Sequence, residues 1–116
     1  MGKFVEAGKK GELTQVAMKA VTVEGRKILL ARVGDRFYAV DGTCPHMGGN
    51  LSEGKLEGTI VTCPLHGSQF DLSDGHVIRW TNFPGLVSSV AKLIKRPRPL
   101  KTYAVKLEGD RILIEV

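Results

Sequence analysis

The chain has 116 residues, of which 42% are apolar and 25% charged, a composition that favours one folded domain with a single core and argues against a disordered chain. No apolar run approaches the roughly 18 residues of a membrane span, and the N-terminal residues lack the apolar run of a secretory signal, so we expect a cytoplasmic protein. The net charge of +5 suits either a solvated basic surface or docking to an acidic protein, nucleic acid or an anionic membrane.

Three apolar segments in the first half predict an antiparallel meander. They cover residues 16–23, 27–33 and 37–40, and the turn signals Glu24-Gly25 and Gly34-Asp35 separate them. Loops of two or three residues between such segments are typical of β-hairpins. We therefore expect three sequential, paired strands.

Further short apolar segments predict strands through the second half of the chain. The predicted strands cover residues 59–62, 70–72, 77–79, 102–107 and 112–116. Strands at this density are typical of a small antiparallel sandwich or barrel. Because we find neither an internal repeat nor a dividing linker, we predict one all-β domain over residues 1–116.

One segment breaks the strand pattern. Over residues 84–96 the apolar side chains recur with a helical period of about 3.6, and Pro97 and Pro99 forbid its continuation. The sequence thus predicts a short amphipathic helix inserted between strands, with its apolar stripe packed on a sheet or facing a partner. Seven basic residues and no acidic one lie from Arg79 to Lys106.

Two predicted loops, at about 41–50 and 62–70, carry similar chemistry. The first contains Cys44-Pro45-His46-Met47-Gly48-Gly49, and the second contains Cys63-Pro64-Leu65-His66-Gly67-Ser68. Proline holds the preceding cysteine extended, and glycine after the histidine allows positive φ and close approach of backbone amides. Thiolate and imidazole together are ligands for a transition metal, not for Ca²⁺ or Mg²⁺.

Several sites could use these four side chains. One is a structural zinc site, although zinc fingers usually pair like ligands on one knuckle. A cysteine–histidine nucleophile pair is another, but no orienting group stands at a recognisable spacing. Coincidental placement is a third. Mixed knuckles best suit a dinuclear centre in which one metal takes both thiolates and the other both imidazoles.

These loops resemble the C-x-H…C-x-x-H boxes of Rieske proteins, and the chain is similar to soluble Rieske-type ferredoxins over nearly its whole length. The flanking segments that carry the similarity are F-Y-A-V-D-G-T, N-L-S-E-G-K-L-E-G, F-D-L-S-D-G-H-V and P-L-K-T-Y-A-V-K-L-E-G-D. The resemblance implies an all-β fold with a small cluster-binding subdomain and one [2Fe–2S] cluster per chain. It also implies that Cys44 and Cys63 bind the buried iron, and that His46 and His66 bind the outer iron.

By resemblance, the function is that of a one-electron carrier and not a catalyst. The implied partners are a reductase that supplies the electron and an oxygenase, aromatic-ring-hydroxylating in type, that accepts it. A terminal oxygenase would need a further domain with a mononuclear iron, and only His76 remains as an additional histidine. A Rieske-like small subunit of an assimilatory nitrite reductase and a zinc-binding interaction domain stay open as alternatives.

Departures from the family refine these expectations. Respiratory Rieske proteins carry an extra cysteine in each box, where this chain has Gly49 and Leu65, and a tyrosine where it has Phe70. Ser68 matches the serine that donates to a bridging sulfide. Fewer donors to sulfur imply a potential toward the lower end of the Rieske range. Because soluble relatives are more often acidic, we hypothesise that the basic insert at 84–96 steers an acidic redox partner.

Overall fold

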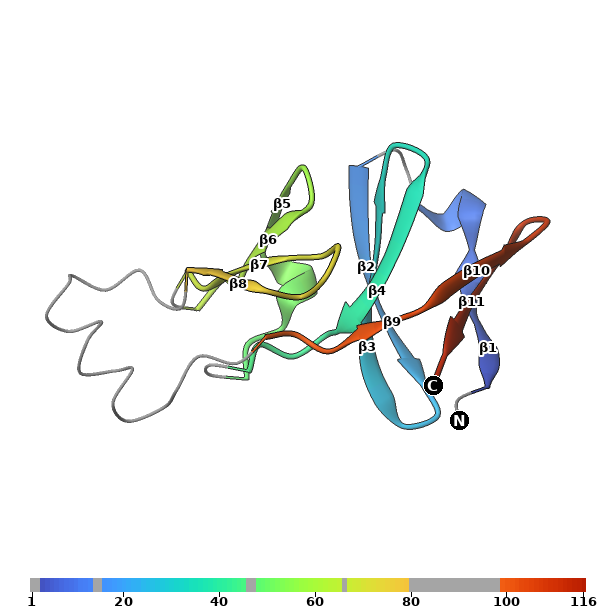
Figure 1. Ribbon diagram of the computed structural model, residues 1–116, viewed down its shortest axis with the longest axis horizontal. Helices are drawn as coiled ribbons and strands as arrows, with labels where there is room; N and C mark the ends of the chain where they lie inside the picture. Colours follow the sequence, from blue (N-terminus) through green and yellow to red (C-terminus); the bar gives the residue numbers. More distant parts are fainter. Residues whose placement is uncertain (1–2, 14–15, 46–47, 66, 80–98) are drawn as a thin grey trace, which may run out of the picture.

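The computed structural model describes residues 3–13, 16–45, 48–65, 67–79 and 99–116, which form short strands and two 3₁₀ turns (Figure 1). The predicted helix at 84–96 lies outside these residues. The elements are β1 (Phe4–Lys9), η1 (Lys10–Glu12), β2 (Val16–Val23), β3 (Arg26–Val33), β4 (Arg36–Asp41), η2 (Leu51–Glu53), β5 (Lys55–Glu57), β6 (Ile60–Thr62), β7 (Gln69–Asp71), β8 (Val77–Arg79), β9 (Thr102–Tyr103), β10 (Val105–Glu108) and β11 (Arg111–Glu115).

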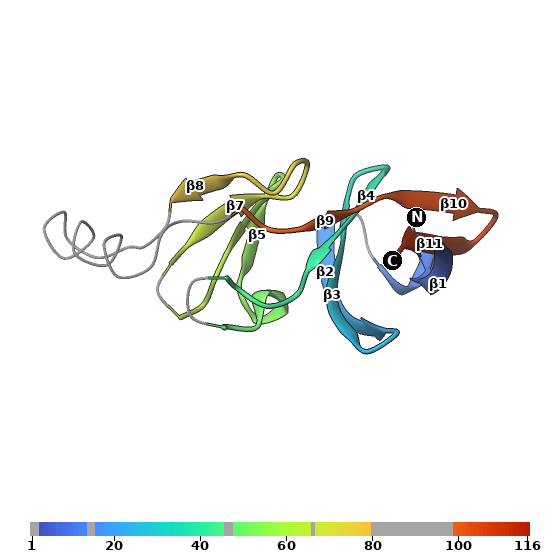
Figure 2. The same cartoon turned by 60° about the horizontal axis from the view of Figure 1, so that its bottom comes forward.

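The strands form three antiparallel sheets, which confirms the all-β prediction. The sheets β2-β3-β4-β9 and β1-β11-β10 make a base, and β5-β6-β7-β8 makes a smaller subdomain. In Figures 1 and 2 the subdomain lies at the end of the molecule opposite to both chain termini. The subdomain is inserted between β4 and β9, so the chain leaves the base after β4 and returns to it at β9.

The meander predicted for the first half is confirmed, since β2 pairs with β3 and β3 with β4. Glu24 (φ 50°) and Gly25 (φ 79°) form the turn between β2 and β3. Positive φ at both central residues is the requirement of the two-residue turn that follows the right-handed twist of paired strands. The Glu24-Gly25 signal therefore fixes the register of the first hairpin.

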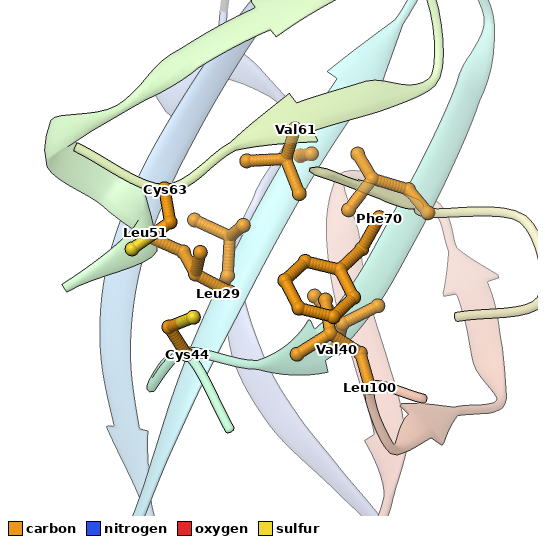
Figure 3. Close-up of a cluster of buried hydrophobic side chains, with 10 residues drawn as sticks. Leu29, Val40, Cys44, Leu51, Val61, Cys63, Phe70 and Leu100 are labelled. Atoms are coloured by element: carbon orange, nitrogen blue, oxygen red, sulfur yellow. The ribbon is translucent and has the colours of Figure 1, made fainter. Parts of the chain in front are cut away.

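Two apolar clusters fill the part of the molecule that the structure describes. One lies within the base and includes Leu13, Ile28, Ile112 and Ile114. The other joins the base to the subdomain (Figure 3). Its buried members are Leu29, Ala31, Val40, Cys44, Leu51, Val61, Cys63, Phe70, Leu72 and Leu100. Both cysteines thus belong to the core that holds the subdomain on the base.

The structure differs from the sequence prediction at several strands. The strands β1 and β5 were not predicted. The first contains a bulge between Glu6 and Gly8, and the second has only three residues, so neither carries a clear alternating pattern. The segment predicted as one strand at 102–107 divides at Ala104, because Tyr103 pairs with β4 while Val105 pairs with β11. A strand that changes sheets in this way makes a corner.

Candidate metal centre

The first cysteine loop is closed by its own backbone. The N–H of Cys44 donates to the carbonyl of Gly49 at 2.8 Å, and the N–H of Gly48 donates to the carbonyl of Cys44 at 2.8 Å. Gly48 has φ 75°, a value that glycine adopts without strain. An antiparallel bridge between Thr43 and Asn50, which flank the loop, joins its two ends. The loop therefore returns on itself directly after β4.

The second loop repeats this arrangement after β6. The N–H of Cys63 donates to the carbonyl of Ser68 at 2.8 Å, and the N–H of Gly67 donates to the carbonyl of Cys63 at 3.2 Å. Gly67 has φ 72°. In both loops, the fourth residue after cysteine donates and the fifth accepts. In the sequence, the histidine stands second after cysteine in the first loop and third in the second.

Both cysteine side chains are buried, with 1% of Cys44 and 2% of Cys63 exposed. Figure 3 shows their sulfur atoms at one end of the apolar cluster, beside Leu51 and Leu29 and away from Phe70. Apolar neighbours exclude water from the sulfurs and lower the local dielectric constant, which strengthens ligand–metal electrostatics. The structure thus brings together the two predicted sulfur ligands.

A close contact joins the two loops. A Cβ atom placed on Gly49 would lie 2.8 Å from Sγ of Cys63 and 3.1 Å from the side chain of Leu65. Only glycine allows the first loop to approach the second sulfur this closely. Two matched loops that meet at a buried sulfur, with thiolate and imidazole donors, suit a metal centre shared by both loops.

The predicted histidines, His46 and His66, lie outside the described residues. The remaining histidine, His76, is on the turn before β8, and its Nδ1 lies 2.5 Å from Oδ1 of Asp74. It is exposed, as expected for an ordinary surface residue. The N–H and ring of His76 hydrogen-bond to Asp74 and lower the pKa of that carboxyl.

Two residues, Gly49 and Arg79, make contacts at the loops that the sequence motifs do not indicate. In the sequence, Gly49 is a glycine of the first loop that stands where respiratory Rieske proteins carry a cysteine, and Arg79 belongs to the basic stretch. In the structure, Nε of Arg79 donates to the carbonyl of Gly67 at 3.0 Å. Neither contact is visible in the sequence. Arg79 is brought to Gly67 by the pairing of β8 with β7, whereas Gly49 meets Cys63 through the packing of two loops that follow strands of different sheets.

Comparisons with known proteins agree with a metal centre shared by the two loops. The pattern of the Rieske [2Fe–2S] domain family matches residues 3–104. The chain is 34% identical over 114 residues to the "Naphthalene 1,2-dioxygenase system, ferredoxin component" of Pseudomonas aeruginosa, covering 98% of this chain and 96% of the relative.

The solved structures that share the fold include a ferredoxin and a reductase subunit. The ferredoxin of carbazole 1,9a-dioxygenase from Nocardioides aromaticivorans IC177 has a TM-score of 0.79 at 24% identity, with 97% of this chain and 96% of that chain covered. A putative nitrite reductase NADPH small subunit has a TM-score of 0.72 at 20% identity, with 97% of each chain covered. At these identities the likeness concerns the fold alone.

Proposed function

Because the chain belongs to the Rieske [2Fe–2S] domain family, we propose that it is a one-electron carrier that passes electrons from a reductase to an aromatic-ring-hydroxylating oxygenase. The observation that carries the proposal is the pair of matched loops with buried cysteines. The relative from Pseudomonas aeruginosa, similar over almost all of both chains, is named as the ferredoxin component of such a system. The chain is accordingly a component that carries electrons, not the catalyst.

We propose that the single [2Fe–2S] cluster is held by four side chains. In this assignment Cys44 and Cys63 bind the inner iron, and His46 and His66 bind the outer iron. The burial of both sulfurs and the contact of Gly49 with Cys63 support the cysteine half of the set. When bound, the cluster accepts and releases one electron.

The residues around the loops keep water from the proposed ligands and hold the loops in place. Leu29 and Leu51 exclude water from the sulfurs, and the paired backbone hydrogen bonds hold each loop in one conformation. A fixed, dry ligand set needs little rearrangement when its charge changes. Ser68, whose carbonyl closes the second loop, is fully buried, which suits the proposed donation of its hydroxyl to a sulfide.

We further propose a cytoplasmic location. Two cysteines reserved for metal binding are typical of a reducing compartment, where structural disulfides are rare. Among the described residues, no helix has the length and apolar character of a membrane span.

The proposed function predicts both a spectrum and a reconstituted activity. The purified chain is expected to be red-brown with about two iron and two sulfide per chain. Mixed with a reductase and the oxygenase component of a naphthalene 1,2-dioxygenase system, it should raise hydroxylated product about tenfold or more over a mixture that lacks it. A colourless chain with one zinc would overturn the proposal in favour of the zinc alternative.

The nitrite reductase alternative is tested in the same preparation. A subunit of that type would support nitrite reduction with its large subunit and would leave oxygenase turnover unchanged. The similarity to a small nitrite reductase subunit is at the level of fold only, whereas the naphthalene system relative is 34% identical. We therefore expect turnover with the oxygenase.

The glycine at the loop contact predicts a defect in cluster retention. In Gly49→Ala, the new methyl group would stand 2.8 Å from Sγ of Cys63, so the sulfur must move by about 0.8 Å to reach ordinary contact distance. We expect iron content after anaerobic reconstitution to fall at least about twofold, since a metal ligand tolerates little displacement. Gly11→Ala, where a Cβ meets nothing within 4 Å, is the matched control. Equal iron content and spectra in both variants would contradict the prediction.

A further inference from the structure

Four residues form a row across the subdomain sheet at its loop end. Lys55 pairs with Thr62, Thr62 pairs with Gln69, and Gln69 pairs with Arg79. Because residues directly opposite each other in regular antiparallel strands project from the same face, Lys55, Thr62 and Gln69 share one face. The pairing of β7 with β8 is irregular between Gln69 and Phe70, and Arg79 joins this set because it lines the same groove as Lys55 and Thr62. We call Lys55, Thr62, Gln69 and Arg79 the loop-side row.

The loop-side row faces outward. The neighbouring residues Val61 and Phe70 are fully buried in the core below the sheet, and side chains alternate between the faces along a strand. Gln69 Nε2 donates to Thr62 Oγ1 at 3.2 Å, which confirms that these two share a face. Lys55, Thr62 and Arg79 also line one groove of about 320 Å³.

This row borders the proposed cluster site. Thr62 directly precedes Cys63, and Gln69 directly follows Ser68. Cys63 and Gly67 line the same groove as the row. A molecule that binds along the row would therefore lie against the second cysteine loop.

The charged side chains at the loop end of this outward face are mainly basic. Lys55 and Arg79, at the two ends of the row, are exposed, and the ion pairs within the described part of the chain involve neither of them. Glu53 also lines the groove, so these three charged residues together carry +1. The groove beside the loop is thus electropositive.

The next outward row, farther from the loop, is acidic. It consists of Glu57, Ile60 and Asp71. Asp71 accepts hydrogen bonds from the hydroxyl and the N–H of Ser73 at 2.6 and 2.9 Å, which lower the pKa of its carboxyl. It therefore stays anionic near neutral pH. Because the two rows have opposite charge, a partner can bind this face in only one favourable orientation.

Building on the proposed function, we propose that the loop-side row docks the electron-accepting oxygenase through carboxylates on the oxygenase surface. Lys55 and Arg79 supply the cations, and Thr62 and Gln69 supply hydrogen-bonding groups between them. The side chain of Leu65, 55% exposed on the adjacent loop, supplies an apolar contact. Apolar contact within a polar rim is the usual composition of a transient interface.

The direction of electron flow assigns the row to the acceptor rather than the reductase. Carboxylates docked beside the cluster stabilise its oxidised state, which is more positive by one charge. By linkage, docking then lowers the reduction potential and favours release of the electron. The same carboxylates on a reductase would oppose uptake of the electron. An acidic surface next to this loop therefore suits the oxygenase.

Charge reversal at one end of the row tests the proposal. We compare Lys55→Glu with Arg36→Glu, which makes the same charge change at an exposed residue of β4 in the base. The reduced holoprotein is mixed in a stopped-flow instrument with the oxygenase that supports turnover. At low ionic strength, electron transfer to the oxygenase should be about tenfold slower for Lys55→Glu than for wild type. The difference should shrink to about twofold or less near 0.5 M salt, and Arg36→Glu should stay within about twofold of wild type throughout.

Two further measurements separate the possible failures. Oxidation by hexacyanoferrate(III), a small anion, should also slow in Lys55→Glu, while its visible spectrum should match wild type. Lys55→Arg, which keeps the charge, should retain the rate of electron transfer. If wild type transfers no electron to any oxygenase, the proposed function itself fails. If wild type transfers but Lys55→Glu behaves as Arg36→Glu, or only reduction by the reductase slows, the docking proposal is overturned.

Discussion

Replacing Cys63 by serine is expected to remove the cluster while leaving a folded chain. Sγ of Cys63 lies in the core at the contact with Gly49, where a shorter, harder oxygen ligand cannot replace a thiolate on iron. Iron should fall from about two to less than about 0.2 per chain, with loss of visible absorption. Cys44→Ser should behave in the same way, because its loop is closed by the same hydrogen bonds.

The control for this experiment is His76→Ala. His76 is exposed and hydrogen-bonded to Asp74, so its loss should leave iron and sulfide at wild-type levels. Cys63→Ala, which keeps an apolar group in the core, separates a ligand effect from a packing effect. Far-ultraviolet circular dichroism should show folded β-structure in all variants. Two retained irons in Cys63→Ser would exclude this residue as a ligand.

A second large effect is expected at Gly75, on the turn between β7 and β8. Gly75 has φ 81°, and a Cβ there would lie 2.1 Å from the carbonyl oxygen of Leu100. Gly75→Ala therefore combines an unfavourable backbone conformation with a clash against another main chain. We expect the free energy of unfolding to fall by about 3 kcal/mol or more, measured by denaturant titration of the apoprotein.

Gly109→Ala provides the matched comparison. Gly109 also has positive φ, at 57°, but a Cβ there meets nothing within 4 Å. Its substitution should cost only the conformational strain of about 1–2 kcal/mol. If Gly75→Ala were no more destabilising than Gly109→Ala, the close approach of the two main chains would be wrong.

Local signals in the sequence predicted the parts of the fold that depend on local interactions. The Glu24-Gly25 turn and its flanking apolar segments were enough for the first hairpin. The division of the predicted strand at 102–107 was not predictable, because Ala104 is ordinary in a strand and the change of sheet is imposed by β4 and β11. The three-residue strand β5 is defined by its partner β6 rather than by its own sequence.

The same distinction holds at the site. Cys44 and Cys63 were predictable as a pair because each stands in a short motif with its proline and histidine. The contact between Gly49 and Cys63 was not, since it joins two loops that are separated in sequence. The loop-side row is still less accessible to sequence reasoning, because it requires the register of four strands at once.

The connection between the subdomain and the base determines whether the subdomain can be removed or replaced. The chain leaves the base after β4 and returns at β9, and these strands are direct neighbours in which Val40 pairs with Thr102. The hydroxyl of Tyr103 also donates to Oδ1 of Asp41 at 2.6 Å. The backbone could therefore bypass the subdomain with a short turn, and the excursion can vary in length without shifting the register of the base.

The packing of the core, unlike the chain topology, ties the subdomain to the base. Leu29 and Val40 of the base are buried against Val61 and Phe70 of the subdomain, so removal of the subdomain would expose apolar surface on β3 and β4. A graft onto another scaffold would have to carry a matching apolar platform as well as the two loops. The subdomain is thus a separable unit in chain topology and an inseparable one in its core.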